Sequence, residues 1–342
     1  MKKRSYGLDL LKVFAAAMVI AVHHFNTIGF YNIKYTGGKT MYLATSIYII
    51  TLTCVPLFLI STGYLLQGRK IEKKHFTKIL YFLIEVALIY LLGILVSLLM
   101  NDNFTLLNWV KIWIKSLLNP AYYIGLYFSI YLVSPFLNRF FISLSDKEKN
   151  LFMIVLIVCI SLPIALNKVF HISFFDTRPS AIWSVMYYFV GLYIYHFQPH
   201  IKYKKLFLIL ILNSIIYGLI ISHYRVGNTY EHVMGYYQNP FVLINAYLIT
   251  VGLYKVQINN FILKKGISIL SSMTLSFYIL SGLYSDRLAM TFINLKGTLL
   301  FDMWTIIPKI FLSIIFSLPI GLIVYFAMRS FSNLFKKQKS IN

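Results

Sequence analysis

Charged residues are scarce in this chain, and acidic residues are the scarcest of them. Of its 342 residues 12% are charged, with 10 Asp and Glu against 32 Lys and Arg. Soluble domains carry about 25% charged residues, so the composition excludes a soluble enzyme or a soluble binding module. Hydrophobic residues make up 59% of the chain, which is typical of a protein that crosses a lipid bilayer several times.

Cysteine is also nearly absent. The two cysteines, Cys54 and Cys159, both fall inside apolar stretches, so we expect neither a disulfide framework nor a metal site. The first apolar stretch is too long for a cleavable signal peptide and no small-residue cleavage site follows it, so we expect it to remain as an anchor. The chain shows no internal repeat or low-complexity linker. Residues 1–342 are therefore expected to form a single transmembrane domain without a separate soluble domain.

Ten apolar stretches are long enough to cross the roughly 30 Å hydrocarbon core of a bilayer. They predict an all-α fold, a polytopic membrane bundle of about ten transmembrane helices. The stretches are residues 8–30, 42–67, 76–100, 121–138, 150–170, 181–197, 205–223, 240–257, 267–285 and 300–328.

The basic residues are unevenly distributed among the segments that join these stretches. In a soluble protein the net charge of +22 would indicate a nucleic-acid partner. Here Lys and Arg lie in short loops between apolar stretches, so no nucleic-acid partner is expected. With the N-terminus inside, 21 of the 32 Lys and Arg fall in the inside segments. The positive-inside rule therefore predicts that both termini face the cytoplasm of a bacterial-type cell membrane.

The first stretch carries ionisable side chains where lipid tolerates few. At about 100° per residue, the step from Lys12 to His23 makes three turns plus about 20°, so both lie on one face, about 16 Å apart along the axis. Such residues by default face a bundle interior or a wet cavity. Alternatively, Lys12 extends to the inner surface and His23 packs as an interhelical hydrogen-bonding residue. Asp9 is spaced to pair with Lys12, and His24 points about 100° away from His23, which favours a structural role.

The densest basic run follows the second stretch and comprises Arg69, Lys70, Lys73, Lys74 and Lys78. Clusters of Arg and Lys bind phosphate groups. One interpretation is therefore a cytoplasmic mouth for a polyanionic molecule. The other is contact with anionic lipid headgroups, together with the effect of these charges on topology.

Polar and aromatic residues also mark the third and fourth stretches. Glu85 lies in the middle of the third stretch and needs a partner, for which Lys12 and His23 are the candidates. Tyr127 and Tyr131, one turn apart, form an aromatic stripe that either packs or lines a sugar-sized cavity.

Residues 101–119 join these two stretches. Trp109 and Trp113 are four residues apart there, and Lys111 and Lys115 lie on another face. This spacing predicts a helix that lies on the outer membrane surface.

Several of these motifs, in this order, resemble the acyltransferase 3 family. The opening is similar, with Gly7-Leu8-Asp9-Leu10-Leu11-Lys12 followed by His23. Further similar segments are Val55-Pro56-Leu57-Phe58-Leu59-Ile60-Ser61-Thr62-Gly63-Tyr64-Leu65-Leu66, Tyr131-Leu132-Val133-Ser134-Pro135, Tyr188-Phe189-Val190-Gly191 and Leu270-Ser271-Ser272-Met273-Thr274-Leu275-Ser276-Phe277-Tyr278-Ile279-Leu280. The chain departs from the family at Lys12, where arginine is usual, at Tyr122, where tryptophan is usual, and at Ser281, where Ile-His often ends the late motif.

The resemblance implies a membrane enzyme that moves acyl groups, commonly acetyl from acetyl-CoA, onto sugar hydroxyls of cell-envelope polysaccharides or glycolipids. By the same resemblance His23 would be the catalytic histidine, Lys12 would act beside it, and the basic residues at 69–78 would bind the CoA. Acetyl-CoA or another acyl-CoA would be the donor substrate, and no resident cofactor is implied.

The residues themselves suit this chemistry. Acyl transfer to a hydroxyl needs a base for the proton and a group that stabilises the oxyanion, and an imidazole such as that of His23 accepts a proton near neutral pH. Two other functions stay open. Lys12, His23 and Glu85 also suit a proton-coupled transporter or flippase of a glycolipid or polysaccharide intermediate, and the chain could be a catalytically silent scaffold of an envelope assembly.

Overall fold

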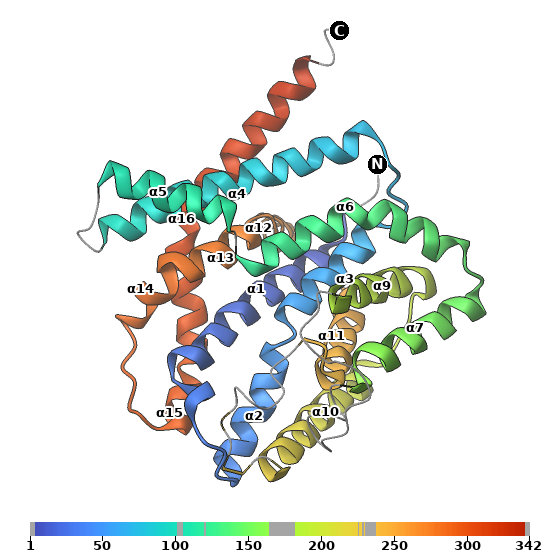
Figure 1. The fold of residues 1–342 in the computed structure, drawn as a ribbon, viewed down its shortest axis with the longest axis vertical. Coiled ribbons are helices and arrows are strands. Elements are labelled where there is room, and N and C mark those ends of the chain that lie inside the picture. Colours follow the sequence, from blue (N-terminus) through green and yellow to red (C-terminus); the bar gives the residue numbers. More distant parts are fainter. Residues whose placement is uncertain are drawn as a thin grey trace.

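The computed structural model describes residues 4–100, 105–119, 121–163, 182–224, 226–227, 229 and 237–338. Within these residues the fold is helical, with one isolated β-bridge between Lys34 and Thr229 (Figure 1). In chain order the helices are α1 (Tyr6–Thr27), α2 (Lys39–Thr51), α3 (Cys54–Leu66), α4 (Lys73–Leu99), α5 (Leu106–Leu118), α6 (Tyr122–Ser143), α7 (Asp146–Ile160), α9 (Ile182–Phe197), α10 (Tyr203–Tyr224), α11 (Pro240–Leu253), α12 (Phe261–Ser272), α13 (Thr274–Leu280), α14 (Asp286–Met290), α15 (Leu299–Trp304) and α16 (Ile306–Gln338).

Six helical segments of the described chain are long and apolar enough to cross a membrane. They are Tyr6–Thr27, Lys39–Leu66, His75–Leu99, Tyr122–Ser143, Tyr203–His223 and Ile306–Asn333. A seventh span results if α12 and the helical segment after it, which are bent by 48°, are taken together. The prediction of an all-α, multi-pass membrane protein is thereby confirmed. The count of ten stays a prediction, and parts of the stretches 150–170 and 181–197 lie outside the described residues.

Helix α1 lies in the middle of the bundle and packs against α2, α3, α11, α12, α13 and α16 (Figure 1). Its middle consists of small and branched residues, and Ala15 and Ala16 are fully buried. Small side chains let neighbouring helices approach closely. The polar residues of α1 therefore meet side chains from several distant parts of the sequence.

Helices α3 and α9 cross with their backbones nearly in contact. A Cβ atom on Gly63 would lie 2.1 Å from the carbonyl oxygen of Tyr188, and one on Gly191 would lie 2.2 Å from that of Ile60. Only glycine fits at both positions. Together with α1, α6 and α11, helix α9 buries almost the whole of α3.

The second predicted stretch is divided into α2 and α3. Helix α2 ends at Thr51 and α3 begins at Cys54. Pro56, in the first turn of α3, accounts for this break. The ring of a proline clashes with the carbonyl four residues earlier, and that residue is Leu52, where α2 is capped.

Helix α5 packs along α4 through the two tryptophans whose spacing predicted a surface helix. The indole N–H of Trp109 donates to the carbonyl of Leu91 (3.0 Å), and that of Trp113 donates to the carbonyl of Ala87 (3.1 Å). Helix α5 thus runs antiparallel along α4 (Figure 1). These two hydrogen bonds satisfy the indole N–H groups within the protein. The position of α5 on the outer membrane surface stays a prediction.

Candidate functional site

The beginning of α1 holds Lys12 in place through its neighbour Asp9. Ser5 caps the helix by accepting a hydrogen bond from the backbone N–H of Leu8. The Lys12 ammonium lies 3.8 Å from Asp9 Oδ1, which also accepts a hydrogen bond from the Ser271 hydroxyl (2.8 Å). The predicted pairing of Asp9 with Lys12 is confirmed.

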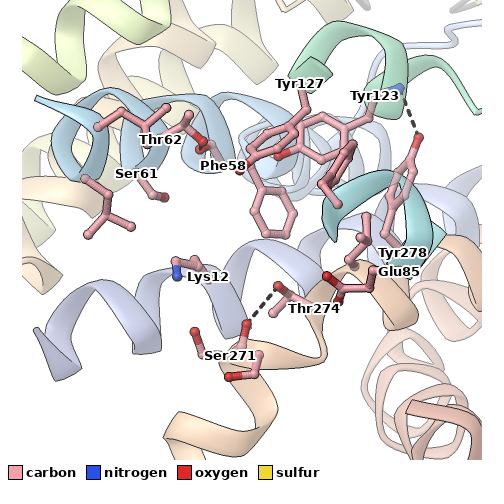
Figure 2. Close-up of a pocket in the computed structure, with 15 residues that line it drawn as sticks. Lys12, Phe58, Ser61, Thr62, Glu85, Tyr123, Tyr127, Ser271, Thr274 and Tyr278 are labelled. Atoms are coloured by element: carbon pink, nitrogen blue, oxygen red, sulfur yellow. Dashed lines mark hydrogen bonds between the residues drawn. The ribbon is translucent and has the colours of Figure 1, made fainter. Parts of the chain in front are cut away.

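Lys12 lines a cavity of about 310 Å³ between α1, α3, α4, α6 and the segment around α12 and α13 (Figure 2). Glu85 and the aromatic rings of Tyr123, Tyr127 and Tyr278 line it as well. Tyr127 therefore lines a cavity, which is one of the two roles considered for the aromatic stripe. The cavity offers a cation, an acid and several hydroxyl groups within a largely apolar wall.

Glu85 shares this cavity with Lys12 but forms no ion pair with Lys12 or His23, as far as the described side chains show. The ion pair expected for Glu85 is therefore not formed. Figure 2 shows Glu85 at the end of the cavity near Tyr278, away from Lys12.

His23 does not line this cavity; it lies three turns further along α1 in a second polar cluster. Its Nδ1 atom is 3.4 Å from Asp286 Oδ2 and 3.5 Å from the Ser281 hydroxyl. The His23 side chain is 40% exposed. Both contacts involve Nδ1, so in the described part of the chain Nε2 is the ring nitrogen left to meet a substrate.

Asp286 connects His23 to the last helix. Its Oδ1 accepts a hydrogen bond from the Ser313 hydroxyl (2.6 Å), and its Oδ2 lies 3.6 Å from the Lys309 ammonium. Lys309 is completely buried and donates a hydrogen bond to the Thr27 hydroxyl at the end of α1 (3.0 Å).

Sequence reasoning missed Asp286 and Lys309. Asp286 lies one residue beyond the ninth predicted stretch, and Lys309 lies inside the tenth. An ionisable residue within a membrane span is a functional signal by default. The position of Lys309 inside an apolar stretch is thus the signal that would have drawn attention to it.

His24 has the structural role that its direction predicted. It is fully buried, and its Nε2–H donates to the backbone carbonyl of Asp302 (2.8 Å). This contact attaches α1 to α15 and leaves His23 as the histidine exposed to a substrate.

The structure brings together only part of the predicted basic run. Arg69 and Lys70 line a groove of about 560 Å³ that also includes Arg139, which sequence reasoning did not select. Lys78 is exposed on α4 outside this groove, and the side chains of Lys73 and Lys74 lie outside the described atoms. None of these basic residues lines the Lys12 cavity within the described chain.

The groove and the cavity are close neighbours. The Asn138 side chain lies in the groove and donates to the carbonyl of Leu66, which lines the cavity (2.8 Å). The path from the basic groove to Lys12 is therefore short. Because α1 is a continuous α-helix from Tyr6 to Thr27, Lys12 and His23 lie on one face of it, as the spacing predicted.

The arrangement provides an imidazole with a carboxylate beside one nitrogen, and a lysine in a cavity on the same helix. An imidazole held this way can accept a proton from a hydroxyl group. Among the described residues, no group of three or more His, Cys, Asp and Glu side chains is placed to hold a metal ion.

Comparisons with known proteins place these features in a family. A family model described as an acyltransferase domain matches residues 5–326. The chain is also similar to a protein named amino-acid racemase from Enterococcus faecalis, with 34% identity over 102 residues. That match covers 28% of this chain and 13% of the racemase, so the chain spans a small part of that protein's length. No solved structure matches. Because the family match covers nearly the whole chain, the protein belongs to the acyltransferase 3 family.

Proposed function

We propose that the protein transfers an acyl group, most simply acetyl, from acyl-CoA to a sugar hydroxyl of a cell-envelope polysaccharide or glycolipid, with His23 as the general base. The observation that carries the proposal is the His23 imidazole, which is 40% exposed and has Asp286 beside its Nδ1 atom. The family assignment favours acyl transfer over the transport and scaffold alternatives.

In the proposed reaction the acceptor hydroxyl attacks the thioester carbonyl carbon. A C–O bond forms and the C–S bond breaks, while His23 Nε2 takes the hydroxyl proton and then passes it to the departing thiolate. The acyl group goes directly from donor to acceptor without an acyl-enzyme. General-base catalysis of this kind contributes roughly 10²- to 10⁴-fold to a rate.

The donor enters from the cytoplasmic side in this proposal. Arg69 and Lys70, together with Lys73, Lys74 and Lys78, bind the phosphates of the CoA, since guanidinium and ammonium groups are the usual phosphate ligands. The thin pantetheine arm then passes Lys12 in its cavity, whose positive charge attracts negative charge of the donor along this entry path. The acceptor reaches His23 from the other side of the membrane.

The test uses sealed, inside-out membrane vesicles from cells that make the natural acceptors, supplied with labelled acetyl-CoA. Wild type should label the envelope polysaccharide or glycolipid, and His23→Gln should reduce the rate by roughly 10²- to 10⁴-fold. His200→Gln is the matched control, because His200 is exposed and far along the chain from the site. Full labelling by His23→Gln would disprove the role of His23 as the base. No labelling by wild type would disprove acetyl-CoA as the acyl donor.

Two double variants, each of which removes two positive charges, test whether the basic groove binds the donor. Arg69→Gln with Lys70→Gln should raise the KM for acetyl-CoA, whereas Lys204→Gln with Lys205→Gln, which removes the same charge from another exposed segment, should not. Equal effects of the two double variants would show a general effect of surface charge instead of a CoA site.

A further inference from the structure

The backbone changes its hydrogen-bond pattern beside His23. Residues Ser281–Ser285 form a π turn between α13 and α14. In an α-helix, residues five apart point about 140° away from each other. In a π turn the backbone bonds join residues five apart, and such turns are frequent at functional sites. Ser281 and Asp286 are five apart, and as a result both face His23 Nδ1.

The two oxygens of the Asp286 carboxylate differ in their hydrogen bonds. Its Oδ1 accepts the hydrogen bond from Ser313, whose hydroxyl also lies 3.0 Å from that of Ser285. Its Oδ2 is buried and accepts no hydrogen bond from any described group. A buried oxygen without a donor costs free energy, so Oδ2 is an acceptor held ready for a donor that approaches it.

The nitrogen in position to donate is His23 Nδ1, which lies 3.4 Å from Oδ2. Hydrogen bonds of catalytic groups are often long before the substrate binds and shorten in the complex. Lys309 lies on the other side of Oδ2, at 3.6 Å. It supplies the countercharge that a buried carboxylate requires.

We propose that Asp286 is the positioning residue of His23 and that the π turn places it there. Asp286 keeps the imidazole proton on Nδ1, so that Nε2 presents its lone pair to the acceptor hydroxyl. When Nε2 takes the hydroxyl proton, the carboxylate stabilises the imidazolium and itself stays ionised. This inference rests on the proposed role of His23 as the base.

The other charged or titratable groups near His23, among the described residues, are engaged with other partners. Lys309 from α16 faces Asp286 and Thr27, and Asp302 of α15 accepts a hydrogen bond from the backbone N–H of Lys296. His24 on α1 is bonded to the carbonyl of Asp302 and points away from His23. In the described chain, Asp286 is the carboxylate within ion-pair distance of His23.

Asp286→Asn tests the proposal by two readouts. The first is acetyl transfer in the vesicles described above, where kcat should fall at least tenfold while the KM for acetyl-CoA stays within about twofold, and Asp286→Glu should restore part of kcat. Asp146→Asn, an equal change at an exposed aspartate of α7 with 67% side-chain exposure, is the control and should leave kcat unchanged.

The second readout needs no substrate. Nitrogen-15 NMR of histidine-labelled protein distinguishes the Nδ1–H tautomer from the Nε2–H tautomer, and the His23 signals are identified by their loss in His23→Gln. Wild type should show the Nδ1–H tautomer, and Asp286→Asn should lose this preference. If Asp286→Asn does not fold, the double variant Asp286→Asn with Lys309→Met removes both charges and is measured instead.

The outcomes separate this inference from the proposed function. An active wild type, an inactive His23→Gln and an unchanged kcat and tautomer in Asp286→Asn would overturn the positioning role alone. An active His23→Gln would disprove His23 as the base and with it the inference. A tautomer change without any acetyl transfer by wild type would support the contact between Asp286 and His23 and reject the donor.

Discussion

At the scale of single residues, the buried Lys309 is the side chain whose loss should be costliest. Its ammonium is completely buried between Asp286 and Thr27. Lys309→Met leaves the Asp286 carboxylate without its permanent countercharge, and breaking a buried ion pair by removing one partner costs about 3–5 kcal/mol. We expect a clearly lower melting temperature in detergent micelles.

The double variant Asp286→Asn with Lys309→Met is the control for this prediction. It removes both charges, and a buried pair replaced as a whole is often tolerated. It should therefore melt closer to wild type than Lys309→Met does. If the double variant is the less stable of the two, the charges do not compensate each other.

Lys12 is the residue at which the chain departs from the arginine usual in its family. Its charge faces the cavity and is fixed by Asp9 at 3.8 Å. In the proposed reaction Lys12 meets negative charge of the donor along its entry path. A hydrogen bond to a charged group contributes about 1.5–3 kcal/mol, so Lys12→Met should reduce kcat/KM for acetyl-CoA by roughly 10- to 100-fold. Lys12→Arg keeps the charge and should retain most of the activity. Wild-type rates for Lys12→Met, at equal abundance in the membrane, would support the interpretation that Lys12 only extends to the membrane surface.

At the scale of helices, the crossing of α3 and α9 depends on two glycines. A methyl group on Gly191 would lie 2.2 Å from the carbonyl oxygen of Ile60, which is backbone and cannot rotate away. Overpacking of this kind costs about 1–3 kcal/mol or more, so Gly191→Ala should lower the melting temperature and the yield of folded protein.

Gly125 in α6 provides the matched control, because a methyl group there would meet no atom within 4 Å. Gly125→Ala should be neutral or stabilising, since alanine favours a helix over glycine by about 1 kcal/mol. Equal effects of the two substitutions would show that helix propensity, and not the close crossing, decides the outcome.

The helices were predictable from the sequence because lipid imposes a local rule, a long apolar run, on each span. The break before Cys54 also has a local cause in Pro56. The pairing of Asp9 with Lys12 and the structural role of His24 follow from helical periodicity within one element. These are relations between residues close in the sequence.

The rest of the site depends on relations between distant elements. Asp286 is 263 residues from His23, and only the packing of α1 against the segment after α13 brings them together. The π turn that aims Asp286 has no marker in Ser281–Ser285 that a periodic pattern reveals. The partners of the α5 tryptophans were not predictable for a similar reason, since they are backbone carbonyls of α4.

At the scale of the whole molecule, the first and last long helices run in opposite directions. Thr27 at the end of α1 is bonded to Lys309 near the beginning of α16, and Figure 1 shows the beginning of α1 and the end of α16 toward the same end of the bundle. This arrangement agrees with the expectation that both termini lie on one side of the membrane, which stays a prediction. The excess of Lys and Arg in the segments expected on that side predicts that it is the cytoplasm.

The orientation decides from which compartment the acyl donor arrives, and it can be measured with single cysteines. In a background with Cys54→Ser and Cys159→Ser, exposed Lys204 on the predicted inside and exposed Asn294 on the predicted outside are each replaced by cysteine. A membrane-impermeant maleimide added to intact cells should label Asn294→Cys and leave Lys204→Cys unlabelled until the membrane is opened. The reverse pattern would place the Arg69 and Lys70 groove outside, where acyl-CoA is absent. The acyl group would then have to come from another donor, and the acceptor would reach His23 from the cytoplasmic side.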